Sequence, residues 1–437
     1  MRRRDFILRL GSATALTLPV GALMGRASAK PSLRAWTHAT IWTGDGEVIE
    51  DGVLVVADER ISSLSKAGPI PAGAEIIEAR GATITPGWVA TETPLGLVEI
   101  ELEPSTVDAR PRGDARPDAI RAAFSAADGY NPASSLLAVA RREGVTSVVS
   151  TPDGGLVSGT SAWADLGDQF SGPALEREAL ALHANLFEGA DNSRPLALSR
   201  LREAFESARV FARSPRAYDL GQTRELGLSV LDLQRLAQVQ SGALPLVVRV
   251  ARASDILRLF ELRKTYPLQL ILSGAEEGWS VAPQIAALGV PVIIDPTENL
   301  PVSFSRLGVR RENAALLSAA GVSVIFSTFD AYTAHNLRQL AGNAVAAGVT
   351  RRSAVRALAL EPALAFGMAK QHGLLARGKL ANFSVWNGDP FELSTWATAV
   401  VIKGRDVTTR SRQSALFDRY RDLSQVPRGR GLAPSER

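Results

Sequence analysis

The sequence has no cysteine and few of the other side chains that bind metal ions. Its 437 residues include no Cys and only 4 His. The absence of Cys excludes disulfides, thiolate nucleophiles and every cysteine-based metal or iron–sulfur site. The small number of His residues limits any imidazole-rich metal centre to a few positions. Lysine is also scarce, and none lies between Lys66 and Lys264.

A large excess of charge is missing as well. The formal net charge is +4, but residues 1–29 contain five Arg and a single acid. Without that segment the basic residues fall from 49 to 44 and the acidic residues from 45 to 44, so the formal charge becomes 0. A neutral chain has no electrostatic reason to bind a polyanion, and we expect no nucleic-acid partner. The hydrophobic share of 46% excludes wholesale disorder.

The N-terminal segment has the pattern of an export signal. Residues 3–8, Arg-Arg-Asp-Phe-Ile-Leu, form a twin-arginine pattern, which an apolar stretch over 11–25 follows. This stretch is too short to cross a membrane and is interrupted by Pro19. We therefore predict a twin-arginine (Tat) signal peptide over 1–29, cleaved after Ala29, with a periplasmic protein and no stable membrane anchor. A short N-terminal anchor is the alternative.

Two blocks far apart in the sequence are rich in short β-strand patterns. Residues 33–85 alternate short apolar runs with turn dipeptides such as Asp45-Gly46, and residues 381–407 form a second block. Pairing the two half-sheets with each other leaves fewer open edges. We predict one small β-sandwich domain built from residues 30–85 and 373–410, followed by a C-terminal tail over 411–437.

The long segment between these blocks, residues 86–372, alternates strand and helix patterns. Short apolar, β-branched runs are typical of parallel strands buried on both faces, and they occur at 145–149, 246–250, 268–272, 290–294 and 322–326. Such repeats favour an α/β fold of the (β/α)8 TIM-like barrel type, with a doubly wound sheet as the alternative. We call the end of this barrel where the strands finish the mouth.

Helices are expected between the runs. The first covers 132–142, with Asn131 as its N-cap, and others lie near 197–212, 229–239, 254–263, 280–288, 310–320, 334–347 and 351–359. Residues 103–118, rich in Glu, Pro, Arg, Asp and Gly, are expected to form a loop.

Several segments resemble the metal-dependent amidohydrolases. Thr85-Pro86-Gly87-Trp88-Val89 resembles the segment that opens their barrel, and residues 373–382 resemble the return into their small β domain, with Asn382 where Asp is usual. Residues 275–279 and 336–344 point to the imidazolonepropionase-like, exported branch. The resemblance covers about residues 35–410. It implies the barrel with its β domain, and hydrolysis of C–N bonds other than peptide bonds.

The resemblance also implies a metal centre at the mouth. In members that hydrolyse C–N bonds its ligands are a His-x-His after strand 1, a carboxylated Lys on strand 4, a His on each of strands 5 and 6, and an Asp on strand 8. These groups fix one or two divalent ions, which lower the pKa of bound water toward neutrality.

This chain departs from that ligand set at nearly every position. The His-x-His falls on Glu92-Thr93-Pro94, and the strand-5 His falls on Arg249, whose guanidinium cannot ligate a cation. The strand-6 His falls on Ser273, and the strand-8 Asp falls on Phe329 or, with a slip of one residue, on Asp330. The gap in lysines leaves no strand-4 carbamate. We therefore predict no metal site and no cofactor, with a single weakly held divalent ion left open.

The four histidines are expected to differ in role. His38 falls in the β domain, and His372 lies at a helix end, where an imidazolium would complement the helix dipole. His183 and His335 are the two that could approach the mouth, and for His183 a hydrogen-bonded core position is the simpler interpretation.

These observations support three hypotheses about the function. The first is an exported amidohydrolase-like protein without metal-dependent hydrolysis, acting as a binding or partner subunit of an intact homologue or associating with itself. The second is a hydrolase of C–N bonds, either non-peptide or dipeptide amides, with an atypical or single-metal site. The third is a periplasmic small-molecule receptor.

The candidate site residues follow from the mouth positions. We expect Glu92 and Asp330 at vestigial catalytic positions. Arg249, Ser273, Glu276 and His335 are the candidate ligand-binding residues. Arg249 is expected to point into the barrel and to pair with Glu92, although it could instead hold a substrate carboxylate or phosphate. Asp153 and Asp295 are expected to stabilise turns and not to take part in catalysis or binding.

Overall fold

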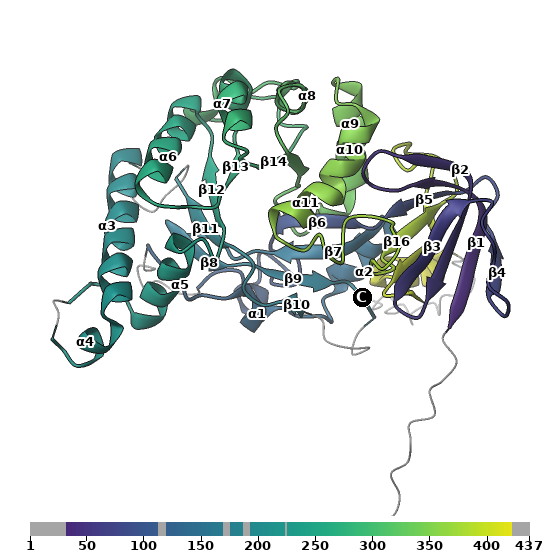
Figure 1. Ribbon diagram of the computed structural model, residues 1–437, viewed down its shortest axis with the longest axis horizontal. Helices are drawn as coiled ribbons and strands as arrows, with labels where there is room; N and C mark the ends of the chain where they lie inside the picture. Colours follow the sequence, from purple (N-terminus) through teal and green to yellow (C-terminus); the bar gives the residue numbers. More distant parts are fainter. Residues whose placement is uncertain (1–31, 112–118, 169–174, 187–192, 223–224, 422–437) are drawn as a thin grey trace, which may run out of the picture. The chain divides into compact units, whose positions relative to one another are not determined.

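The computed structural model describes residues 32–111, 119–168, 175–186, 193–222 and 225–421 (Figure 1). The chain separates into residues 1–31 and residues 32–437, and only the second unit is described here. The predicted signal peptide and its cleavage site therefore lie outside the described residues. Among the described residues no helix is both long and apolar enough for a membrane span.

The two β-rich blocks of the sequence pair in one sheet. Its strand order is β18-β17-β16-β5-β1-β2-β3, and β4 pairs with β1. The N-terminal block supplies β1 (Leu33–Trp42), β2 (Val48–Ala57), β3 (Arg60–Lys66), β4 (Glu75–Glu78) and β5 (Thr83–Pro86), and the C-terminal block supplies β16 (Phe383–Trp386), β17 (Ala397–Ile402) and β18 (Arg405–Asp406). Antiparallel β5 and β16 join the blocks. The ladders thus run through one eight-stranded sheet rather than the two sheets of a sandwich.

Seven further strands are parallel to their sequence neighbours. These are β6 (Trp88–Thr93), β7 (Val145–Ser150), β11 (Leu182–Asn185), β12 (Leu246–Val250), β13 (Leu270–Gly274), β14 (Val292–Ile294) and β15 (Val324–Phe326). β6 pairs with β7, and β11 to β15 pair in sequence order. The predicted alternation of buried strands with helices is present.

Between β7 and β11, at the third place in this arrangement, the chain runs in the opposite direction. β8 (Val157–Thr160) is antiparallel to β11, β9 (Ala162–Asp165) is antiparallel to β7, and β10 (Leu175–Arg177) pairs with β9. The connection between β7 and β8 covers only residues 151–156. A parallel crossover needs a dozen or more residues, so the chain must turn back here.

The ladders therefore show a mixed α/β fold that is consistent with a TIM-barrel-like arrangement without closing it. In the described part of the chain no ladder joins β15 to β6. The contact between these two strands' ends is a hydrogen bond that Ser327 Oγ donates to the Thr91 carbonyl. The expected eightfold repeat of parallel strand and helix is thus wrong at its third strand.

Most helices lie where the sequence predicts them. They are α1 (Ala126–Gly129), α2 (Ser135–Arg142), α3 (Arg194–Arg213), α4 (Pro215–Asp219), α5 (Val230–Gln240), α6 (Ala253–Thr265), α7 (Ala282–Ala287), α8 (Asn313–Ala319), α9 (Leu337–Ala346), α10 (Arg351–Leu358), α11 (Leu360–Ala365) and α12 (Arg412–Tyr420). Short 3₁₀ turns are η1 (Pro104–Thr106), η2 (Gly278–Val281), η3 (Phe304–Arg306) and η4 (Ala334–Asn336). In Figure 1, α3, α6 and α7 follow one flank of β11 to β13.

Three local expectations need correction. Helix α2 begins at Ser135, because Ser134 Oγ caps it by accepting from Leu136 N at 3.3 Å. Asn131 instead closes the turn before it, accepting from Ala133 N at 2.9 Å. The predicted loop over 103–118 contains η1, and residues 112–118 lie outside the described part. The predicted tail contains α12.

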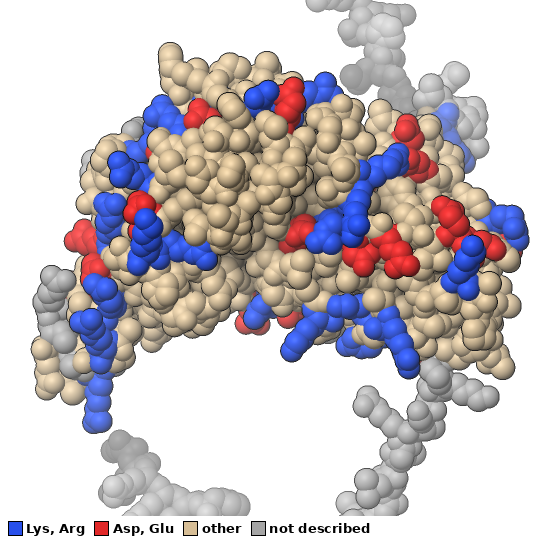
Figure 2. Space-filling view, turned by 45° about the horizontal axis from the view of Figure 1, so that its top comes forward, with Lys and Arg blue, Asp and Glu red and all other residues tan. Residues whose placement is uncertain are grey.

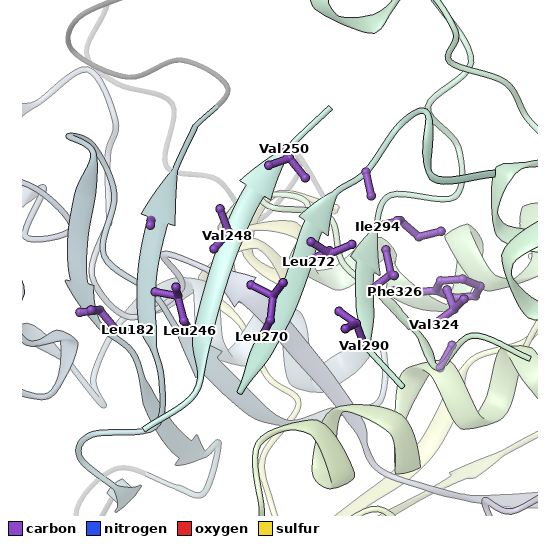
Figure 3. Packing of buried hydrophobic residues seen from close by; sticks show 14 of the residues in the cluster. Leu182, Leu246, Val248, Val250, Leu270, Leu272, Val290, Ile294, Val324 and Phe326 are labelled. Carbon is purple, nitrogen blue, oxygen red and sulfur yellow. The ribbon is translucent and has the colours of Figure 1, made fainter. Parts of the chain in front are cut away.

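Both faces of the parallel strands are buried, and this places the polar residues at the mouth. Leu246, Val248 and Val250 of β12 pack with Leu270 and Leu272 of β13 in the cluster that faces the helices (Figure 3). The alternate residues of neighbouring strands form a second cluster on the other face, which includes Val247, Ile271, Ile293 and Ile325. Side chains alternate along a strand, so the two positions that follow on this inner face are polar: Arg249 and Ser273, which are register partners.

Candidate functional site at the strand ends

Arg249 lies on the inner face of β12 and reaches the mouth. The carbon Cζ of its guanidinium lies 4.2 Å from the centre of the Phe329 ring, which covers one face of the planar group. In the described residues no carboxylate oxygen lies within 4.0 Å of its nitrogens. The expected direct ion pair with Glu92 is therefore absent, although the Arg249 charge does lower the pKa of Glu92.

Glu92 occupies the end of β6 and is almost wholly buried. Its Oε2 has no hydrogen-bond partner, and its Oε1 lies 4.0 Å from His183 Nδ1. Burial raises the pKa of Glu92 to about 7, against the opposing effects of the Arg249 charge and the Ser273 hydroxyl. A carboxyl group with this pKa exchanges its proton near neutral pH, which is the property of a general acid or base.

His183 faces Glu92 from β11. Its Nε2 lies 2.8 Å from Ser161 Oγ, whereas its Nδ1 is buried without a partner. Burial lowers the pKa of His183 to about 3, so the imidazole is neutral at neutral pH. The contact with Glu92 is thus not an ion pair. The core interpretation of this residue accounts for only one of its two ring nitrogens.

Ser273 and Glu276 extend the site along β13. Ser273 is fully buried, and its Oγ has no hydrogen-bond partner of acceptable geometry even though the hydroxyl faces Glu92. Glu276 is also buried, with Oε1 3.2 Å from Arg306 Nε and with Oε2 unpartnered. Burial raises the pKa of Glu276, and the charges of Arg306 and Arg249 only partly oppose this.

Three residues at the mouth hold strained backbone conformations. Glu92, Ala275 and Phe329 have φ of 49°, 45° and 56°, a left-handed region that costs a side chain-bearing residue about 1–3 kcal/mol. They lie at the ends of β6 and β13 and just after β15. Ser327 Oγ fixes one of these turns by accepting from Phe329 N at 2.9 Å. Strain of this kind gathers at functional sites, where surrounding structure maintains it.

The other predicted site residues are engaged elsewhere. Asp330 Oδ1 accepts from Thr333 N at 2.8 Å and so holds the turn before η4. His335 is half-buried on η4, and no hydrogen bond or ion pair in the described part of the chain joins it to the mouth residues. Asp295 Oδ1 accepts from Thr297 N, and Asp153 Oδ1 accepts from Gly154 N, as expected for acids that hold turns.

The structure thus brings together four of the predicted residues, Glu92, Arg249, Ser273 and Glu276. Sequence reasoning missed the ring of Phe329 over Arg249 and the pairing of Glu276 with Arg306, because both depend on loop conformations. The position of His183 could have been found, since residues two apart on a strand share a face and Asn185 is the register partner of Arg249.

A small pocket opens beside this group. It is lined by Arg249, Gly274, Glu276, Asp295, Pro296, Glu298, Val309, Arg310, Asn313 and Phe329. Basic and acidic side chains are interspersed on the face of the molecule drawn in Figure 2. The pocket has the same mixed character, with both signs of charge among its lining residues.

His372 lies away from the mouth, and its imidazole contacts a buried carboxylate. It is buried, and its Nε2 lies 3.1 Å from Asp165 Oδ1. Ser147 Oγ donates to the same carboxylate at 2.7 Å, and Asn382 Nδ2 donates to Oδ2 at 3.2 Å. Burial acts to raise the pKa of Asp165, but these hydrogen bonds and the imidazole hold it below its ordinary value. His372 is therefore part of a buried polar cluster that joins β7 and β9 to β16.

Comparisons with known proteins show what this chain is similar to. Residues 271–407 match the amidohydrolase family. No match to a curated protein sequence was found.

Several solved structures share the fold. An amidohydrolase from Thermotoga maritima MSB8 aligns with a TM-score of 0.78 at 19% identity, over 86% of this chain and 100% of that one. A prolidase complexed with N-methylphosphonate-L-proline aligns with a TM-score of 0.56 at 14% identity, over 86% and 99% of the two chains. Molinate hydrolase aligns with a TM-score of 0.55 at 15% identity, over 93% and 100%. At these identities the likeness concerns the fold alone.

Proposed function

The chain contains an amidohydrolase-family domain, and we propose that it is a binding subunit that has kept this fold without two-metal hydrolysis. The observation that carries the proposal is the guanidinium of Arg249 on the inner face of β12, beside Glu92 and under Phe329. In metal-dependent relatives the resemblance puts an imidazole ligand at this position. A guanidinium has no lone pair to give a cation and carries a permanent positive charge that repels one.

The donor set at the mouth does not fit a pair of divalent ions. Within the described ranges no group of three or more His, Asp or Glu side chains is arranged to hold a metal. Glu92 and His183 provide two donors 4.0 Å apart, whereas protein sites for zinc use three or four. Asp330, the remaining candidate ligand, is engaged by Thr333. These residues therefore support no hydrolytic step through a metal ion.

The same residues are well suited to binding a polar ligand. Glu92 Oε2, His183 Nδ1, Ser273 Oγ and Glu276 Oε2 are buried without hydrogen-bond partners. Each such atom costs about 1–3 kcal/mol, so native proteins normally satisfy these atoms with water or a ligand. Glu276 lines the pocket, and four such atoms gathered at the strand ends favour a binding site over a packed core.

An exposed apolar loop near the mouth supports the partner role. The side chains of Leu300, Val302, Phe304 and Leu307 are between 63% and 84% exposed. The backbone that carries them is held in place, because Arg252 Nη2 donates to the Phe304 carbonyl at 3.1 Å and Arg194 Nη2 donates to Ser305 Oγ at 2.6 Å. Apolar side chains held rigidly in solvent are typical of protein interfaces. We propose an intact amidohydrolase homologue as the partner, with Tat export to the periplasm.

Elemental analysis of the protein purified from periplasm tests the binding-subunit proposal. We expect less than one zinc or manganese ion per chain, and no lactam or dipeptide hydrolysis when either metal is added. Arg249→His, which restores an imidazole, is the matched variant and should raise metal content above that of the wild type. Two tightly held ions per wild-type chain together with hydrolysis would overturn the proposal.

Co-purification tests the partner role separately. Tagged protein from periplasm should bring down a homologue with intact metal ligands, and Phe304→Ser should lose it while keeping the same unfolding midpoint. A monodisperse monomer with no homologous partner would count against this role.

A metal-free hydrolase is the second candidate function. The observation that favours it is Glu92, whose pKa of about 7 and free Oε2 suit proton transfer to a bound substrate. Hydrolysis that persists in EDTA and is abolished in Glu92→Gln would establish this function in place of the binding role.

A further inference from the structure

Arg249 presents a free guanidinium edge at the mouth. The Phe329 ring, 4.2 Å from Cζ, covers one face of the planar group. In the described part of the chain the guanidinium makes neither a hydrogen bond nor an ion pair. Its in-plane N–H groups therefore form an unoccupied fork, the geometry that binds a carboxylate through two parallel hydrogen bonds.

The neighbouring arginines are already engaged. Arg310, which also lines the pocket, lies 3.1 Å from Glu312 and stacks over the ring of Trp279. Arg306 pairs with Glu276 at 3.2 Å and with Glu298 at 3.5 Å. The cationic charge that has no close counter-ion at this pocket is thus that of Arg249, within the ranges that the structure describes.

A second donor lies beside the fork. Ser273 is the register partner of Arg249 on the adjacent strand, and the two side chains share the inner face. Its hydroxyl is buried and faces Glu92, and it makes no well-formed hydrogen bond. A buried hydroxyl next to a free guanidinium provides N–H and O–H donors on the same side of the site, which an acceptor such as an oxyanion would satisfy.

We propose that the mouth binds a small organic monocarboxylate, held by hydrogen bonds from the Arg249 guanidinium and the Ser273 hydroxyl. This inference rests on the proposed function, because it needs positive protein charge where metal-dependent relatives hold cations. A monoanion balances one guanidinium. A phosphate dianion would in addition face the carboxyl groups of Glu92 and Glu276, both of which interact with Arg249.

Thermal unfolding of the purified protein with butyrate as the probe tests this site. A ligand that binds only the folded state raises the unfolding midpoint progressively with its concentration. We expect such a rise with butyrate and none with butyramide, which has the same shape without the charge. Inorganic phosphate should give a smaller rise than butyrate. Calorimetric titration with butyrate then gives the dissociation constant.

Three variants locate the effect. Arg249→Gln should abolish the butyrate response. Arg249→Lys keeps the charge but loses the fork, and it should weaken binding about tenfold, the loss of one charge-assisted hydrogen bond. Arg258→Gln, a change of the same net charge on the exposed face of α6, should leave the response unchanged. Circular dichroism of each variant establishes that the fold is intact.

The outcomes separate this inference from the proposed function. No response of the wild type to butyrate, an equal response to butyramide, a larger response to phosphate, or an unchanged response in Arg249→Gln would each overturn the carboxylate site. If the protein is metal-free in those cases, the binding-subunit proposal stands without it. Two bound ions with hydrolysis would overturn both.

Discussion

At the scale of single residues, Glu92 controls how the mouth responds to pH. The charges of Arg249 on β12 and Asp153 after β7 act on it, as does the Ser273 hydroxyl on β13. His183 on β11 lies 4.0 Å from its Oε1. Burial outweighs the attraction of Arg249 and raises the pKa of Glu92 from 4.5 to about 7. The folded protein therefore keeps a proton on this group over a range in which the unfolded chain has released it.

The stability of the fold should reflect this retained proton. Relative to Glu92→Gln, the wild type is most stable below pH 4.5 and loses that advantage as the pH rises to about 7, where the carboxyl ionises in the folded state. The full change is about 3 kcal/mol, from 1.36 kcal/mol per pKa unit. Urea unfolding of both proteins across this range measures it. A difference that does not vary with pH would contradict the shift.

The affinity for butyrate should also depend on whether Glu92 is protonated. A bound anion near Arg249 favours the protonated form of Glu92, so affinity should be higher at pH 6 than at pH 8, by up to about tenfold for a one-unit rise in the pKa of Glu92. His183, with its pKa near 3, stays neutral across this range and does not contribute. In Glu92→Gln the change of affinity with pH should be smaller, because Glu276, whose pKa is also raised and which also interacts with Arg249, then remains to titrate. Calorimetric titrations at the two pH values make the comparison.

At the scale of secondary-structure elements, the packing of helix α2 depends on one cap. Ser134 Oγ accepts from Leu136 N at 3.3 Å and also donates to Glu99 Oε2 at 2.6 Å. Ser134→Ala should therefore destabilise the protein by about 1–2 kcal/mol. Asn131→Ala, which removes the expected but unused cap, should cost less. Denaturant midpoints of the two variants distinguish them, and an equal or larger loss in Asn131→Ala would contradict this assignment of the cap.

Hydrophobic patterning predicted most of these elements, but it did not predict strand direction or the conformations of loops. The runs that became β7 and β12 are apolar on both faces, so their sequence indicates a buried strand directly. The same rule cannot give strand direction, and the reversal of β8 and β9 follows only from the short connection before them. At the site, strand spacing placed Arg249 and Ser273 correctly. It could not predict the stacking of the Phe329 ring on Arg249 or the position of Arg306, because both depend on loop conformations.

At the scale of the whole molecule, a buried polar cluster joins the eight-stranded sheet to the parallel strands. Asp165 receives hydrogen bonds from His372, Ser147 and Asn382, and Asn382 Oδ1 accepts in turn from Lys403 N at 2.7 Å. This explains why the sequence has Asn where the resembling family has Asp. A carboxylate at position 382 would face that of Asp165.

Asn382→Asp tests this explanation. Two buried carboxyl groups at hydrogen-bond distance cannot both ionise easily, so the variant should lose about 3 kcal/mol of stability at neutral pH. Its added carboxyl has a raised pKa in the folded state, so the loss should shrink as the pH falls and one proton is shared. Asn387→Asp, an exposed position that keeps its acceptor for Trp396 N, is the control and should have little effect. Urea unfolding at two pH values separates the outcomes.

The antiparallel direction of β8 and β9 also limits which loops at the mouth can lengthen during evolution. In a fully parallel barrel each strand ends at the mouth and leads into a loop that can lengthen freely. Here the third strand begins there, after a tight turn with left-handed glycines at 154 and 155 and with carbonyls of Asp153 and Gly154 bound by Arg121. New specificity is therefore more readily gained by insertion beyond the strands from β11 onward, while this side of the opening stays a fixed wall.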